Sequence, residues 1–388
     1  MTRHVPPVLR LVQDVAAPDQ PPDLPLPVSE TDIALPEHDL SPGSSQPPPF
    51  LVPANHVKDQ RPPTHRQVGV VQMRLYTYLK SWHRFYSENF GFQLLHSYDF
   101  PEWKFSLYFM GILEEGETWP TPGTKESEDA LWTTRGSVLE FTYNHGSEKD
   151  DAFTVSNGNV EPYRGFGHIA VMTRDVYAAA AELESNGVRF QKRPDEGRMK
   201  GIAFALDPDG YWVELVPRGE SSTVRNKYTL AQTMLRVKDP VMSLRFYRDI
   251  LGMSLLRESH FSDFSLYFLA HLPPGTPLPE VPDSPEAGDF IRNMFPQVIE
   301  LTHNHGTEND PDFKYYNGND QGAGQIRGFG HTGFLVDDLT EATAFFDEHG
   351  VKFKKRPEEG SMRGLAFVFD PDNYWVEIIQ RKGLSLTK

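Results

Sequence analysis

Hydrophobic and polar positions alternate along much of residues 67–382, and short helical stretches interrupt the alternation. Within 167–216, G-H-I-A-V-M has the period of a strand, and D-V-Y-A-A-A-A-E-L-E-S-N-G follows it with Asp175 as N-cap and Gly187 as helix terminator. The runs V-R-F-Q, A-F-A-L and Y-W-V-E-L-V predict three more strands, the last two joined by the turn D-P-D-G. This segment therefore predicts a strand–helix–strand–strand–strand (βαβββ) unit.

The segment before it has the same outline. Its pattern predicts a strand near 70–76, a helix near 81–89 and strands at 92–98, 104–111 and 137–143. Both units then recur about 160 residues later. R-G-F-G-H occurs at Arg164–His168 and Arg327–His331, and V-L-E-F-T-Y-N-H-G-S-E at 138–148 returns as V-I-E-L-T-H-N-H-G-T-E at 298–308.

The conserved order and nearly constant offset of these motifs indicate a duplicated domain. We expect an α+β fold of four βαβββ units, with paired curved sheets that enclose clefts. The expected domains are 67–218 and 228–382. Residues 1–66 differ, since they hold 15 of the 33 prolines and no Trp or Tyr. We expect that segment to be a disordered, proline-rich extension.

Composition narrows the classes of partner. The formal net charge is −16, which argues against a nucleic-acid partner. The chain has no cysteine, which excludes disulfides and thiolate metal sites and fits a reducing, cytoplasmic location. No stretch approaches 18 consecutive apolar residues, so we expect no membrane span.

Polar residues inside the apolar strands are the candidate chemistry. A single Glu or His in such a strand usually has a structural role, but here His168, Glu214 and Glu300 each have a twin one domain away, and Gln232 is a fourth candidate. Two carboxylates, an imidazole and an amide oxygen suit Zn²⁺, Ni²⁺, Co²⁺ or Mn²⁺. A divalent cation would also remove the cost of burying two carboxylates together. The candidates are His168, Glu214, Glu300 and Gln232.

Seven motifs in order resemble the glyoxalase I family (lactoylglutathione lyases) of the vicinal-oxygen-chelate superfamily. They are Q-T-M-L-R-V-K-D-P, K-F-S-L-Y-F, V-I-E-L-T-H-N-H-G-T-E, Y-N-G-N, R-G-F-G-H, M-K-G-I-A-F and D-P-D-G-Y-W-V-E, and the resemblance covers about residues 68–380. It points to the fused, two-domain form known from fungi. Single-domain relatives are homodimers whose metal sites draw Gln and Glu from one subunit and His and Glu from the other, so the resemblance implies a monomer with two composite sites.

The resemblance also implies roles for individual residues. One metal site would comprise Gln232, Glu300, His168 and Glu214, and the other Glu140, His331, Glu377 and a ligand near Val71 or Gln72. Glu214 and Glu377 would be the principal catalytic bases, with Glu300 and Glu140 as their metal-bound partners. Zn²⁺ is the expected cation, with Ni²⁺ or Co²⁺ as alternatives, and glutathione is the cosubstrate.

In this family the substrate is the hemithioacetal of methylglyoxal and glutathione, and a proton shifts from C1 to C2 to give S-lactoylglutathione. The resemblance places the γ-glutamyl end of glutathione on Arg236, Asn304 and Arg164, and its glycine carboxylate near Lys192, Arg198 and Met199. Remaining counterparts in the other site are Asn144, Arg327, Lys355 and Met362. Phe261, Leu266, Phe268 and Met199 are the expected walls of the pocket.

The second site departs from the family pattern. Without a gap, Gln232 aligns with Val71 and Arg236 with Leu75; a one-residue slip brings Gln72 and Tyr76 to those places instead. Strand polarity favours the slip. Ser361 also stands where Arg198 stands in the other copy. We therefore expect a second site that binds metal but has lost glutathione anchors.

Two other functions stay open at this point. Extradiol dioxygenases of the same superfamily use two His and one Glu on Fe(II). A non-catalytic module that binds metal or thiols is the other alternative.

Overall fold

The computed structural model describes residues 70–75, 79–134, 136–150, 153–319, 326–360 and 362–381. The predicted extension 1–66, together with Tyr76 and Ser361, lies outside the described residues.

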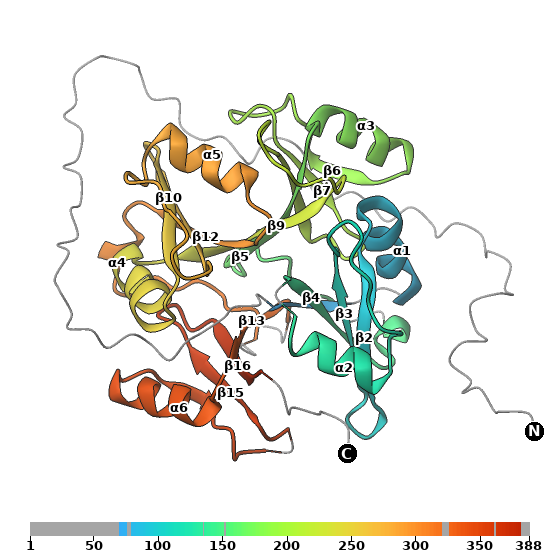
Figure 1. The fold of residues 1–388 in the computed structure, drawn as a ribbon, viewed down its shortest axis with the longest axis vertical. Coiled ribbons are helices and arrows are strands. Elements are labelled where there is room, and N and C mark those ends of the chain that lie inside the picture. Colours follow the sequence, from blue (N-terminus) through green and yellow to red (C-terminus); the bar gives the residue numbers. More distant parts are fainter. Residues whose placement is uncertain are drawn as a thin grey trace, which may run out of the picture. The chain divides into compact units, whose positions relative to one another are not determined.

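The first domain contains two βαβββ units, as predicted (Figure 1). Its first unit comprises β1 (Val70–Leu75), α1 (Leu79–Phe90), β2 (Gln93–Phe100), β3 (Phe105–Gly111) and β4 (Val138–Asn144), with α2 (Lys125–Leu131) inserted before β4. Its second unit comprises β5 (Phe166–Thr173), α3 (Val176–Ser185), β6 (Arg189–Lys192), β7 (Ala203–Leu206) and β8 (Trp212–Pro217).

The second domain repeats this order. Its first unit comprises β9 (Thr229–Val237), α4 (Pro240–Leu244) with a π-helical continuation (Arg245–Ile250), β10 (Ser254–His260), β11 (Phe264–Ala270), α5 (Pro285–Asn293) and β12 (Val298–Asn304). Its second unit comprises β13 (Phe329–Val336), α6 (Leu339–Glu348), β14 (Phe353–Lys355), β15 (Leu365–Phe369) and β16 (Trp375–Gln380). The α+β fold of four βαβββ units is therefore confirmed.

Local signals in the sequence explain where the helices begin and end. Asp175 accepts a hydrogen bond from the backbone nitrogen of Ala178 and caps α3, while Gly187 follows that helix with φ +81°. A positive φ strains residues that carry a Cβ, so glycine ends the helix there. Asp239 and Asp338 cap α4 and α6 in the same way. No helix in the described part of the chain is both long and apolar enough to cross a membrane.

Each of the two eight-stranded sheets is shared between the domains (Figure 1). One sheet has the order β14-β15-β16-β13-β1-β4-β3-β2 and the other β10-β11-β12-β9-β5-β8-β7-β6. The junctions are the antiparallel pairs β1–β13 and β5–β9. Every sheet therefore joins the first unit of one domain to the second unit of the other.

The duplicated motif R-G-F-G-H lies where the domains meet. Phe166 and Phe329 stack on each other with ring centroids 4.8 Å apart and an interplanar angle of 6°. A Cβ on Gly165 would overlap the carbonyl oxygen of Tyr316, and one on Gly328 would overlap that of Ser156. The motif recurs because each copy packs against the backbone of the other domain.

Candidate metal and active sites

Four buried polar side chains converge in the sheet formed by β9, β12, β5 and β8. The Nε2 atom of His168 lies 3.2 Å from Oε2 of Glu214 and 3.8 Å from Oε2 of Glu300. Gln232 donates its amide nitrogen to the same two oxygens, at 2.8 Å to Glu214 and 2.6 Å to Glu300. These four residues, called the first cluster, were all predicted from the sequence.

Strand register brings the first cluster together. Glu214 of β8 pairs with Ala170 of β5, which pairs with Gln232 of β9. His168 and Glu300 lie two residues from this row, on β5 and β12. Because side chains two residues apart on a strand share a face, all four cluster members point to one side of the sheet.

The first cluster can hold a divalent cation. The ligand atoms of its imidazole and two carboxylates lie within 4.8 Å of one another. Nε2 of His168 is buried and has no hydrogen-bond partner among the described residues, although a carboxylate is near. A half-turn of the Gln232 amide exchanges its nitrogen and oxygen, so this side chain can offer an oxygen ligand. The donor set therefore fits zinc, nickel or cobalt.

Burial and charge act against each other in the first cluster. Burial lowers the pKa of His168, but Glu214 and Glu300 outweigh it and raise that pKa to about 9. Burial is also the main cause that raises the pKa of Glu214, against the lowering effect of His168. Two carboxylates with 5 % exposure each are costly without a positive charge between them.

A second cluster repeats this arrangement in the other sheet. Nε2 of His331 lies 3.1 Å from Oε2 of Glu377 and 3.6 Å from Oε2 of Glu140, and all three side chains are buried. Among the described residues, this Nε2 also has no hydrogen-bond partner. Burial lowers the pKa of His331, while Glu377 and Glu140 raise it to about 9. The structure thus brings both predicted His–Glu–Glu sets together.

The backbone register of β1 differs from the expected slip. Gln232 pairs with Val298 on β12; the twin of Val298 is Val138, and Val138 pairs with Val70. Gln72 instead pairs with Glu140, two residues further along. The ungapped alignment placed Val71 opposite Gln232, and strand polarity favoured Gln72. The structure instead places Val70 there, one residue in the other direction. Ligation by Gln72 stays a prediction.

The same register corrects the expectation for the arginine anchor. Arg236 pairs with Thr302 on β12, and Arg74 pairs with Thr142, the twin of Thr302, on β4. Arg74 is therefore the register equivalent of Arg236, and the expectation of Leu75 or Tyr76 at that position is wrong. The error arose because alignment from the helix misses a one-residue difference in the connection between strand and helix.

Arg236 braces the junction between the domains. Its guanidinium donates to the carbonyl oxygens of Gly158, Gly165 and Phe166, and to Oδ1 of Asn159, at 2.9–3.3 Å. Its side chain is buried, and burial is the main cause that lowers its pKa, followed by the charge of Arg164. Arg236 thus holds the loop before β5, which leads into His168.

The other predicted anchors lie on several elements around the first cluster. Lys192 donates to the carbonyl oxygens of Met199 and Ile202, both at 2.7 Å, which fixes the loop after β6. Asn304, at the end of β12, donates to the Tyr315 hydroxyl at 2.7 Å. Arg164 lies 3.5 Å from Glu161. Arg198 donates to Asp263, and both Met199 and the predicted wall residue Phe261 are 41 % exposed.

The counterparts of these residues lie around the second cluster. Lys355 donates to the carbonyl oxygen of Leu365 at 2.9 Å, which matches the bond from Lys192 to Ile202. Met362 packs beside a hydrophobic group that includes Leu365. Asn144 pairs with Phe105, while Arg327 accepts a backbone hydrogen bond from Ser156 at 2.7 Å.

Sequence reasoning missed three residues near the first cluster. The ring of Phe204 lies 5.3 Å from that of His168, and Thr302 donates to Oε1 of Glu300 at 3.2 Å. Asp263 pairs with Arg198. The alternation in A-F-A-L and E-L-T contained the signal for the first two. Phe204 pairs with Glu214 on the neighbouring strand, and Thr302 lies two residues after Glu300. Nothing in the local sequence indicated Asp263.

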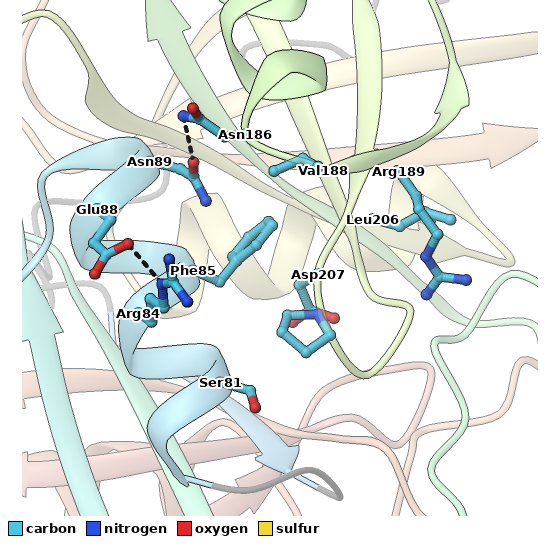
Figure 2. A pocket seen from close by; sticks show the side chains of 12 residues that line it. Ser81, Arg84, Phe85, Glu88, Asn89, Asn186, Val188, Arg189, Leu206 and Asp207 are labelled. Carbon is cyan, nitrogen blue, oxygen red and sulfur yellow. Dashed lines mark hydrogen bonds and ion pairs between the residues drawn. The ribbon is translucent and has the colours of Figure 1, made fainter. Parts of the chain in front are cut away.

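A polar groove of about 480 Å³ lies away from both clusters, between α1 and the segments that flank β6 and β7 (Figure 2). Its floor includes Phe85 and Leu206. Arg84 pairs with Glu88, and Asn186 donates to Asn89. No residue of either cluster lines the groove.

Comparison with known proteins agrees with this architecture. Residues 76–215 and 229–378 each match the model of the Glyoxalase/Bleomycin resistance protein/Dioxygenase superfamily. Over 310 residues the chain is 42% identical to "Glyoxalase I" of Saccharomyces cerevisiae, covering 76% of this chain and 87% of that protein. Over 303 residues it is 40% identical to "Lactoylglutathione lyase" of Schizosaccharomyces pombe, covering 77% and 91%. The crystal structure of glyoxalase I from Zea mays aligns with a TM-score of 0.57 at 25% identity, covering 82% and 93%.

Proposed function

We propose that this chain, which belongs to the glyoxalase I family, isomerises the hemithioacetal of methylglyoxal and glutathione to S-lactoylglutathione. The observation that carries the proposal is the buried set of His168, Glu214, Glu300 and Gln232, assembled from both domains. Relatives named glyoxalase I and lactoylglutathione lyase match most of the chain that builds it. The role would be methylglyoxal detoxification in the cytoplasm.

The reaction moves a proton between neighbouring carbons, so it needs a carboxylate that can accept and return that proton. Glu214 is our choice for this base, because burial raises its pKa and thereby its basicity. Glu300 would be its partner in the cluster, while His168 and Gln232 complete the ligand set. A bound divalent cation supplies Lewis-acid stabilisation of the negative charge that develops on the substrate oxygens. Zn²⁺ is our first choice, with Ni²⁺ or Co²⁺ as alternatives.

Glutathione is anionic at both ends, so an acidic protein must supply cations close to the cluster. We place the γ-glutamyl end near Arg164, Arg236 and Asn304, and the glycine carboxylate near Lys192, Arg198 and Met199. Lys192 supports this placement, since it pairs with Phe204, which pairs with Glu214. Two strand spacings, roughly 10 Å, separate Lys192 from the proposed base.

The second cluster would bind a cation through Glu140, His331 and Glu377, with Gln72 as the candidate fourth ligand. Its substrate contacts would come from Asn144, Arg327, Lys355 and Met362. We expect it to contribute less turnover, because the position equivalent to Gln232 is Val70. The fused chain would act as a monomer, since one chain by itself assembles both composite clusters.

The test is thioester formation by the purified full chain. Methylglyoxal and glutathione together should give S-lactoylglutathione, and omission of glutathione should stop the reaction. A chelator should abolish activity, and Zn²⁺, Ni²⁺ or Co²⁺ should restore it, with metal content measured in parallel. Failure of the metal-loaded chain to form thioester would refute the proposal. Oxygen consumption with catechols would indicate a dioxygenase instead, although each cluster has one imidazole rather than two.

A further inference from the structure

An ion pair joins two loops that adjoin the outermost strands of the sheet that contains the first cluster. Arg198 donates to both carboxylate oxygens of Asp263, at 3.2 and 3.1 Å. Arg198 lies in the loop after β6, and Asp263 lies in the turn between β10 and β11. Since β6 and β10 are the opposite edges of an eight-stranded sheet, this contact requires the sheet to curve enough to bring the loops at its two edges together.

The cluster lies on the face that this curvature encloses. On β8, Val213 and Leu215 point to the opposite side from Glu214, into a core that also contains Leu183 of α3. That face is therefore covered by helix. Glu214 points to the face opposite α3, and so do Phe204 and Lys192 at the paired positions of β7 and β6.

We propose that Asp263 is a specificity-determining residue, which competes with the carboxylate at one end of the substrate for the guanidinium of Arg198. This inference rests on the proposed function, because it takes a glutathione adduct as the substrate. A ligand whose reacting carbons lie at the cluster extends past Lys192 toward Arg198. In the absence of substrate, Asp263 pairs with the Arg198 guanidinium.

The exposure of the pair allows this competition. The side chain of Arg198 is 64% exposed and that of Asp263 is 48% exposed. Exposed ion pairs of this kind change an equilibrium by about fivefold at most, and salt weakens them. A substrate carboxylate can therefore displace Asp263, at a modest loss of affinity.

The second cluster has the opposite charge at the matching place. Asp263 precedes Phe264, which pairs with Asn304, while Lys104 precedes Phe105, which pairs with Asn144. The competing carboxylate thus lies in the sheet of the first cluster, and the equivalent turn in the sheet of the second cluster carries a cation.

The experiment compares kcat and KM of the full chain and Asp263→Asn, with two adducts of methylglyoxal. One adduct is made with glutathione, and the other with glutathione whose glycine carboxylate is an ethyl ester. Asp263→Asn should lower KM for the glutathione adduct by about two- to fivefold, leave kcat unchanged and leave KM for the ester unchanged. Asp129→Asn, which removes a carboxylate paired with Lys125 on α2, is the matched control and should change neither KM.

A double-mutant cycle with Arg198→Met separates competition from a general charge effect. In the Arg198→Met background, Asp263→Asn should have no further effect on KM. Equal effects on both adducts, an effect that persists without Arg198, or no effect in an active enzyme would each overturn the inference while the proposed function stands. Absence of thioester formation by the unmodified chain would instead refute the proposed function.

Discussion

The two clusters share one geometry. In the first, His168 Nε2 lies 3.2 and 3.8 Å from its two carboxylates, and in the second, His331 Nε2 lies 3.1 and 3.6 Å from its own. Their surroundings differ at single positions. The strand register puts Gln232 beside the first cluster and Val70 at the matching place beside the second.

This comparison teaches how the two copies of a duplicated domain can diverge. Each cluster takes its His and one Glu from one domain and its other Glu from the other domain. A change in β1 therefore alters only the second cluster, although β1 belongs to the first domain. The unit that contains β1 can lose a ligand while the first cluster stays complete.

The largest expected effect is on turnover, and it tests directly whether the two clusters contribute unequally. Glu214→Gln should lower glutathione-dependent turnover of methylglyoxal by about 10²–10⁴, because it removes the proposed proton carrier. Glu377→Gln should leave most of the turnover. Steady-state kinetics at matched metal content gives the answer, since either change can empty its cluster. Equal losses, or a larger loss from Glu377→Gln, would contradict the proposed inequality of the sites.

The next effect concerns the fourth ligand position. Gln232→Val should weaken cation binding at the first cluster by at least about 10–100-fold, and Val70→Gln should strengthen it at the second. Competition with a chromogenic chelator measures both affinities. Gln72→Ala is the discriminating control: a large loss at the second cluster would show that Gln72, rather than position 70, faces the cation.

The smallest effect tests the register through stability. Arg236→Met should lower the free energy of unfolding by about 1–3 kcal/mol, because the buried carbonyl oxygens of Gly158, Gly165 and Phe166 lose their donor. If Arg74 is its equivalent, Arg74→Met should cost a similar amount. Urea denaturation of metal-saturated protein measures both. A change within about 0.5 kcal/mol for Arg74→Met, typical of an unconstrained surface position, would argue against the register.

Much of the fold could be predicted because the pattern of strands and helices in the first domain recurs in the second. The alternation in G-H-I-A-V-M, the cap Asp175 and the terminator Gly187 are local, so they can be recognised without knowledge of any tertiary contact. The cluster residues could be found for a related reason: a carboxylate or imidazole within an apolar strand stands out, and its twin shows that the position is kept in both copies.

The register of β1 and the partner of Arg198 could not be predicted. Val70 pairs with Val138, the twin of Val298, because β1 lies between β4 and β13. These two strands are about 70 and 260 residues away in the chain. Asp263 meets Arg198 because the sheet curves through eight strands, and no local pattern records that curvature. Thus the sequence by itself determined the elements, the duplication and the candidate ligands, which depend on local periodicity and side-chain chemistry. Strand register and the contact between Arg198 and Asp263 depend on how distant segments come together, so only the tertiary structure decided them.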